Sequence, residues 1–214
     1  MGQYDLLSQI RVTQTYRLAG AVFGSVIDPQ FWTASNNGAG SAAAVSGGIA
    51  TVISGTANNG YGHISSAQSG RFMFVHPHLY RAAIRIPTLG VAKCTRRWGA
   101  LTVSGIAPHN GFFFSLNEND SLSVNCVSDG TVSSVPSGEF NGPVVHSFTM
   151  NDKVHAYEVE YFEMAALFSI DGLPMHRFTP ATEKLAMSLH HFAVATSVND
   201  ADGTASGRDR KSVV

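Results

Sequence analysis

Glu158 and Glu160 have the spacing of a catalytic carboxylate pair, because residues two apart on a β-strand share one face. Retaining glycosidases hold two such carboxyl groups about 5–5.5 Å apart, one as acid and one as nucleophile. Isolated charged residues, however, usually mark solvent-exposed positions. We therefore expect Glu158 and Glu160 to lie on a solvated outer face of a strand, and we predict no catalytic residues.

Nine histidines raise the question of a metal site. His76 and His78 are separated by one residue, and His190 and His191 are adjacent. A metal site needs three or four convergent ligands with supporting hydrogen bonds. The segment 200–203 begins like a calcium loop but has no glutamate at the required distance. We therefore predict no metal site. The sequence also contains no nucleophile elbow and no phosphate-binding glycine loop, so we predict no cofactor.

Alternation along the expected strands separates the aromatic residues into two groups. Phe112 and Phe114 fall on one face of a strand and Phe113 on the other. Together with Trp32 and Trp98, the first two are expected to fill the core. Phe113 is then the aromatic side chain that we expect at an exposed surface or an interface.

Two further segments contain side chains suited to contact a partner. Tyr61 and His63 stand in an expected loop at 58–63, where they and the neighbouring asparagines could contact a glycan. Arg96 and Arg97 precede a tryptophan and could form a cation–π stack or an ion pair between subunits. On an edge strand, the same arginines would instead discourage aggregation.

The apolar pattern of the chain is that of strands. Alternation recurs about every 10–15 residues with turn signals between, which is typical of a sandwich or barrel. Gly47-Gly48 and Asp171-Gly172 are hairpin signals. Only residues 182–189 are suited to a short helix. The strand-like segments are 9–16, 42–45, 49–54, 80–86, 112–116, 122–126, 155–161, 167–170 and 190–196. We predict an all-β, two-sheet antiparallel β-sandwich.

Composition narrows the classes of partner. Charged residues make up 14% of the 214 residues and the net charge is −1, with no basic stripe to neutralise phosphates. Nucleic acid is therefore not expected as a partner. No stretch approaches the roughly 18 apolar residues of a membrane span, and no export signal precedes the first turn. Cys94 and Cys126 could pair, although buried free thiols are the commoner outcome for cysteines in strand-like runs.

Three pairs of motifs together resemble a known group of proteins. They are FWT at 31–33 after an Asp-Pro turn, TRRWG at 95–99 followed by NGFFF at 110–114, and VHAYEV at 154–159 followed by FSIDG at 168–172. The last pair resembles the strand–hairpin–strand signature of concanavalin-like (laminarinase-like) jelly rolls. The combination resembles virion structural proteins of tailed bacteriophages that contain this sandwich.

The resemblance implies a function and a domain organisation. A jelly roll at 28–198 would stand between an N-terminal arm at 1–27 and a polar C-terminal tail at 199–214. The chain would be a non-enzymatic virion subunit that decorates the capsid or attaches to the tail through contacts with other virion proteins. It would form a homo-oligomer and assemble in the host cytoplasm.

Hydrolysis and glycan recognition are the two other functions of this group. Its β-glucan hydrolases have a Glu-x-Asp-x-(x)-Glu strand, which this sequence lacks, so we expect no enzyme. The alternative to the virion role is a carbohydrate-binding module that recognises host-surface glycans. The residues that we expect at an interface or a glycan are Tyr61, His63, Arg96, Arg97 and Phe113.

Overall fold

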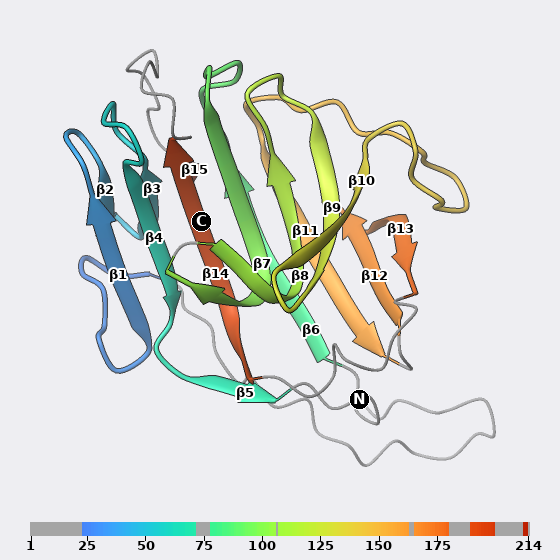
Figure 1. Ribbon diagram of the computed structural model, residues 1–214, viewed down its shortest axis with the longest axis horizontal. Helices are drawn as coiled ribbons and strands as arrows, with labels where there is room; N and C mark the ends of the chain where they lie inside the picture. Colours follow the sequence, from blue (N-terminus) through green and yellow to red (C-terminus); the bar gives the residue numbers. More distant parts are fainter. Residues whose placement is uncertain are drawn as a thin grey trace.

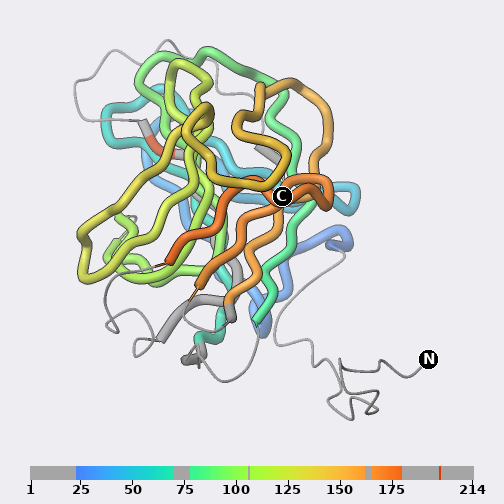
Figure 2. Tube along the Cα trace, turned by 90° about the vertical axis from the view of Figure 1, so that its right-hand side faces the viewer, coloured from blue at the N-terminus to red at the C-terminus, as the bar shows by residue number. Residues whose placement is uncertain are grey.

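The computed structural model describes residues 23–71, 78–105, 107–162, 165–179, 189–199 and 212–213. All regular structure in these ranges is strand, arranged as two antiparallel sheets that stack face to face (Figures 1 and 2). The predicted all-β sandwich is therefore confirmed. Within the same ranges, no helix has the length and apolarity needed to cross a bilayer.

One sheet has eight strands and the other seven. The order across the eight-stranded sheet is β1 (Trp32–Asn37), β4 (Tyr61–Ser66), β14 (Leu189–Asn199), β7 (Cys94–Ser104), β8 (Ala107–Leu116), β9 (Leu122–Ser128) and β10 (Thr131–Pro136), with β5 (Ser69–Arg71) also paired to β14. The order across the seven-stranded sheet is β13 (Leu173–Phe178), β12 (Ala165–Ile170), β11 (Val154–Phe162), β6 (His78–Arg85), β15 (Ser212–Val213), β3 (Ile49–Ile53) and β2 (Ala42–Ser46).

The core lies between the sheets and is rich in aromatic side chains. Trp98 meets Tyr157 edge-on at 4.9 Å between ring centroids, and Phe114 meets Phe168 in the same way at 5.1 Å. Such edge-to-face pairs are favourable beyond the area they bury. The predicted core aromatics Trp32, Trp98, Phe112 and Phe114 are all buried there, which confirms the inward face of these strands.

Both cysteines are buried and free, as the strand-like context favours. Cys126 lies in the core between the sheets, where burial raises the pKa of its thiol to about 12. A thiol with so high a pKa stays protonated near neutral pH and is a poor nucleophile.

Two-residue hairpins connect several neighbouring strands, as the sequence predicts at Gly47-Gly48 and Asp171-Gly172. Both residues of each pair have positive φ, 59° and 81° in the first and 52° and 78° in the second. This conformation matches the twist of the strands and suits glycine and aspartate. Asp129-Gly130 forms a third turn of this kind between β9 and β10.

Other predictions differ from the structure or lie outside the described residues. The segment 58–63 is not a loop throughout, because β4 begins at Tyr61 and pairs with β1 and β14 along its length. Ser212 and Val213, in the predicted tail, pair with β3 and β6. The predicted lead-in strand at 9–16 and the helical turn as far as residue 188 lie outside the described residues.

Candidate functional site

Four of the residues expected to contact a partner lie on the outer face of the eight-stranded sheet. Register defines this face: Arg97 opposes Thr196, which in turn opposes His63 on β4. Tyr61 is two residues before His63 and so shares its face. Phe113 pairs with Gly99, two residues after Arg97, and falls on the same side. Residues far apart in the sequence are thus brought together on one surface.

Arg96 lies on the opposite face, and its predicted contact with a partner or glycan is wrong for the described chain. Its side chain is 1% exposed, because its strand neighbours Cys94 and Trp98 also face inward. The adjacent Arg97 is half-buried on the outer face. Of the two arginines, only Arg97 can reach a ligand from solvent.

Phe113 has the predicted face but not the predicted exposure, since only 2% of it is accessible. With Leu101 and Val127 it forms a second apolar cluster, separate from the core between the sheets. A Cβ at Gly99 would lie 2.8 Å from the Phe113 Cβ, and one at Gly111 equally close to the Leu101 Cβ. The glycines therefore let Phe113 and Leu101 pack down onto the sheet, which makes the expectation of an exposed Phe113 wrong.

A row of polar residues crosses the central strands beside this apolar cluster. Arg97 on β7 pairs with Ser115 on β8, which pairs with Ser123 on β9. All three side chains are half-buried, so part of each is open to solvent. His63 is only 6% exposed, so its predicted contact with a partner or glycan is wrong, as it is for Arg96 and Phe113. We call Tyr61, Arg97, Ser115 and Ser123 the outer strip.

Asn125 lies two residues from Ser123 on the same face of β9 and is almost fully buried. Its amide nitrogen donates to the Ser115 Oγ at 2.9 Å and to the Phe113 carbonyl at 3.2 Å. Carbonyl oxygens can only accept, so this network fixes which end of the amide points at β8. The carboxamide oxygen of Asn125 accepts no hydrogen bond from the described part of the chain.

Sequence reasoning did not single out Ser115, Ser123 and Asn125. The signal that could have found them was alternation, which places Ser123 and Asn125 opposite the core residues Leu122 and Val124. Alternation does not show which strands lie next to each other in the sheet. Only the pairing of β8 with β9 shows that these residues extend a row that contains Arg97.

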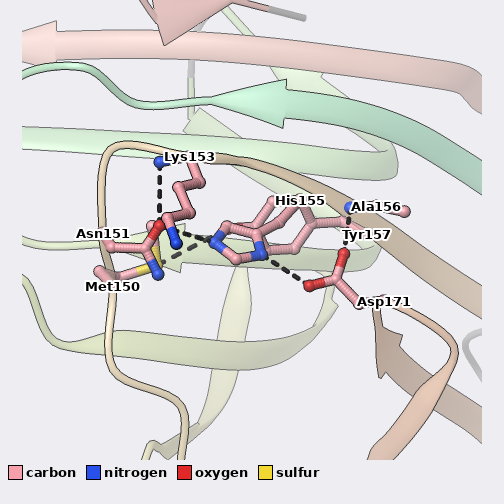
Figure 3. A network of polar contacts seen from close by, with 7 residues as sticks. All are labelled: Met150, Asn151, Lys153, His155, Ala156, Tyr157 and Asp171. Atoms are coloured by element: carbon pink, nitrogen blue, oxygen red, sulfur yellow. Dashed lines mark hydrogen bonds and ion pairs between the residues drawn. The ribbon is translucent and has the colours of Figure 1, made fainter.

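A second polar group lies where β11 begins, between β12 and β6 in the order of the seven-stranded sheet (Figure 3). His155 Nδ1 is 2.6 Å from Asp171 Oδ2, and its Nε2 is 3.0 Å from Asn151 Oδ1. The Lys153 backbone N–H donates to the same Asn151 oxygen, which confirms that oxygen as an acceptor. Both ring nitrogens of His155 therefore face oxygen acceptors.

This group holds the β12–β13 hairpin against β11. Asp171 Oδ1 accepts the Ala156 backbone N–H at 2.8 Å while Oδ2 contacts His155. Partial burial raises the pKa of the Asp171 carboxyl, but the hydrogen bonds from His155 and Ala156 and the nearby imidazole more than offset this, so the pKa lies below its usual value. Both ring nitrogens of His155 and both carboxylate oxygens of Asp171 have partners within the chain, which is the arrangement of a structural clasp.

The remaining candidates for chemistry lie apart from the outer strip. Glu158 and Glu160 are on the outer face of the seven-stranded sheet, where Glu158 pairs with Arg81 at 2.9 Å and Glu160 is exposed. Their predicted solvated position is confirmed. His76 and the side chains of His190 and His191 lie outside the described residues. Elsewhere in the described ranges, no three His, Cys, Asp or Glu side chains cluster as metal ligands would.

Comparison with known proteins gives structural but no sequence relatives. No protein-family model matches the chain, and no curated protein is similar to it in sequence. A β-glucanase of Bacillus licheniformis superposes with a TM-score of 0.59 at 12% identity, over 89% of this chain and 94% of that one. A β-1,3-glucanase from Mycobacterium marinum gives 0.59 at 12%, over 91% and 92%. The carbohydrate recognition domain of Emp46p gives 0.57 at 11%, over 88% and 89%.

These structures confirm the concanavalin-like jelly roll and correct one other prediction. The expectation of a non-enzymatic chain is contradicted, because named β-glucanases share the sandwich over nearly all of its length. Nothing in the comparisons indicates a bacteriophage virion protein. The virion location and the homo-oligomer remain predictions. At 11–12% identity the likeness establishes the fold and leaves activity to be argued from the residues.

Proposed function

We propose that this chain is a carbohydrate-binding domain that holds a glycan on the outer face of its eight-stranded sheet. The observation that carries the proposal is the outer strip, which lines up hydroxyl, guanidinium and aromatic side chains from β4, β7, β8 and β9. The fold is also one that glucanases and a carbohydrate recognition domain use.

The chemistry of the strip suits a sugar. A sugar presents hydroxyl groups that both donate and accept, and the Ser115 and Ser123 hydroxyls can do the same. Asn125 adds a fixed acceptor on the same face. Tyr61, half-buried at the end of the strip, offers an aromatic surface with a polar tip. Small side chains at the serine positions leave room for a ring to approach the sheet.

Glycan-array screening of the full chain, followed by calorimetric titration with the best ligands, tests the proposal. We expect specific binding that Tyr61→Ala weakens by about two- to tenfold, the effect of losing one aromatic contact. Ser123→Tyr should abolish binding because it fills the strip. Leu79→Ala is the control, since Leu79 is an exposed apolar side chain on β6, in the other sheet. Binding that survives Ser123→Tyr, or no binding to any glycan, would overturn the proposal.

The same assays should measure release of reducing ends from β-glucans, because the fold is shared with β-glucanases. In the described strands β4, β7, β8 and β9 the outer-face positions contain no aspartate or glutamate. Turnover that Ser123→Tyr blocks would place the reaction on this same face. Turnover that Ser123→Tyr leaves unchanged would place it elsewhere in the molecule.

A further inference from the structure

Four asparagine–glycine pairs occur in the chain, at 37–38, 59–60, 110–111 and 141–142. In such a pair, the backbone nitrogen of the glycine can attack the side-chain carbonyl carbon of the asparagine, because glycine has no Cβ to block the approach. The attack needs a glycine N–H that donates no hydrogen bond and an asparagine whose backbone can rotate. The fold therefore decides which of the four pairs can react.

Three of the pairs are held through their glycines. The Gly60 N–H donates to the Ala57 carbonyl at 2.9 Å, and the Gly142 N–H donates to the Met175 carbonyl at 2.8 Å. Gly111 lies inside β8, which pairs with β7 on one side and with β9 on the other. All three glycines are buried. Each pair must therefore break a hydrogen bond or open locally before it can react, which costs free energy.

The asparagine side chains of two of these pairs are held as well. The Asn141 Nδ2 donates to the Arg177 carbonyl at 3.0 Å, and its Oδ1 accepts the Arg177 N–H at 2.7 Å. The Asn110 Oδ1 accepts the Asp129 N–H at 2.9 Å. An amide engaged in this way cannot turn toward the next backbone nitrogen without losing these hydrogen bonds.

The pair at 37–38 has none of these restraints. Asn37 is the last residue of β1, and both Asn37 and Gly38 are exposed. Within the described residues, neither the Asn37 side chain nor the Gly38 N–H makes a hydrogen bond, although the Gly38 carbonyl accepts from the Ser41 Oγ at 2.7 Å. A Cβ at Gly38 would lie 2.8 Å from the Ala57 Cβ, and its φ of 95° favours glycine. The fold thus requires the reactive glycine and leaves its nitrogen unbonded.

We propose that Asn37 is a site of spontaneous modification, at which the chain deamidates through a succinimide. The Gly38 nitrogen loses its proton and bonds to the side-chain carbonyl carbon of Asn37. The bond from that carbon to Nδ2 breaks, and Nδ2 leaves as ammonia after taking up the proton. Water then opens the ring at either of its carbonyl carbons. The product is an aspartate or an isoaspartate at position 37, with no oxidation or reduction.

The modification changes the end of β1 beside Tyr61. Asn37 pairs with Tyr61 in the register of β1 and β4. Both products replace a neutral amide by a carboxylate. Isoaspartate also adds a methylene group to the backbone, which displaces the end of the strand from its pairing. We therefore expect the aged chain to unfold at a lower temperature than the fresh chain.

Peptide mapping by mass spectrometry of the full chain, incubated in mildly alkaline buffer, tests the proposal. We expect Asn37 to react at least about tenfold faster than Asn59, Asn110 or Asn141, because those sites must first break a hydrogen bond or open locally. In guanidinium chloride the four rates should converge, because the fold no longer distinguishes the pairs. A faster reaction at any of the other three in the native chain, or an unchanged ratio in denaturant, would overturn the proposal.

Asn37→Gln is the matched variant. Glutamine keeps the amide but must close a larger ring, so the early release of ammonia seen in the parent chain should disappear. The substitution should leave the fold intact, because the position is exposed and its side chain makes no hydrogen bond in the described residues. The parent chain should lose thermal stability with age, whereas the Asn37→Gln chain should not. An equal loss in both chains would assign the reaction to another residue and overturn the proposal.

The outcomes are independent of the proposed function. The rates at the four asparagines are measured without a ligand, so failure to bind glycans overturns the carbohydrate-binding function and leaves the modification site as measured. Where a glycan does bind, its affinity for the parent chain should fall in proportion to the modified fraction, because position 37 lies opposite Tyr61. The affinity of the Asn37→Gln chain should stay constant with age.

Discussion

Two histidines of the seven-stranded sheet make different hydrogen bonds through their ring nitrogens. His155 has a carboxylate oxygen within 2.6 Å of Nδ1 and an amide oxygen within 3.0 Å of Nε2. His176 instead accepts the Asn141 backbone N–H at its Nδ1, which requires a neutral ring. Burial lowers the pKa of His176, consistent with that role. The folded state therefore disfavours a proton that the unfolded chain would take up at His176.

Acid should destabilise the fold through His176. Because its folded pKa lies below the unfolded value of about 6.5, its neutral form contributes fully above that pH. As pH falls below about 6.5, the unfolded state binds the proton first and stability decreases until the folded pKa is reached. Urea unfolding at about pH 7 and about pH 5.5 should show a larger loss in the parent chain than in His176→Gln. Other titrating groups cancel in this difference, and equal losses would contradict the prediction.

Residue-level prediction from the sequence succeeded for faces and failed for exposure. Alternation correctly separated Phe112 and Phe114 from Phe113, because the period of a strand is fixed by its backbone. It could not predict that Phe113 is covered, since this depends on Gly99 lying opposite on another strand. For Arg96 and Arg97, alternation likewise predicts that the side chains lie on opposite faces of the strand. It does not predict which of the two is buried.

At the scale of elements, Gly62 marks the closest approach between β4 and the β2–β3 hairpin. A Cβ there would lie 2.3 Å from the Ala42 carbonyl oxygen and 2.6 Å from that of Ile53. Both contacts are with backbone, which cannot turn aside as a flexible side chain could. The glycine therefore sets how closely the seven-stranded sheet approaches the other at this end of the sandwich.

Gly62→Ala should be one of the most destabilising methyl additions in the chain. Its Cβ requires the β2–β3 hairpin to move, so we expect a loss of roughly 3 kcal/mol, in the upper range for overpacking. Gly24→Ala is the control, because nothing lies within 4 Å of a Cβ at that position. The control should stay within about 0.5 kcal/mol of the parent chain in chemical denaturation. A similar small effect for Gly62→Ala would mean that the hairpin is not packed as closely as described.

At the scale of the molecule, strands late in the sequence complete both sheets. β14 lies between β4 and β7, and β15 lies between β3 and β6 (Figure 1). Hairpins were predictable because Gly47-Gly48 and Asp171-Gly172 encode their turns locally. The position of β14 between β4 and β7 was not predictable, because alternation identifies a strand without identifying its neighbours. The outer strip was hidden for the same reason, since its row passes through β14.

Two truncations separate the roles of the late strands. A chain that ends at residue 188 lacks β14, which leaves β1 and β4 unpaired from β7–β10, and we expect it to lose cooperative unfolding. A chain that ends at residue 199 keeps β14 and loses β15, whose two residues pair with β3 and β6. It should fold with a lower unfolding temperature and bind the same glycans, because the outer strip lies on the other sheet. Near-ultraviolet circular dichroism during heating distinguishes the two, and a native spectrum for the 1–188 chain would show that β14 is dispensable for the sandwich.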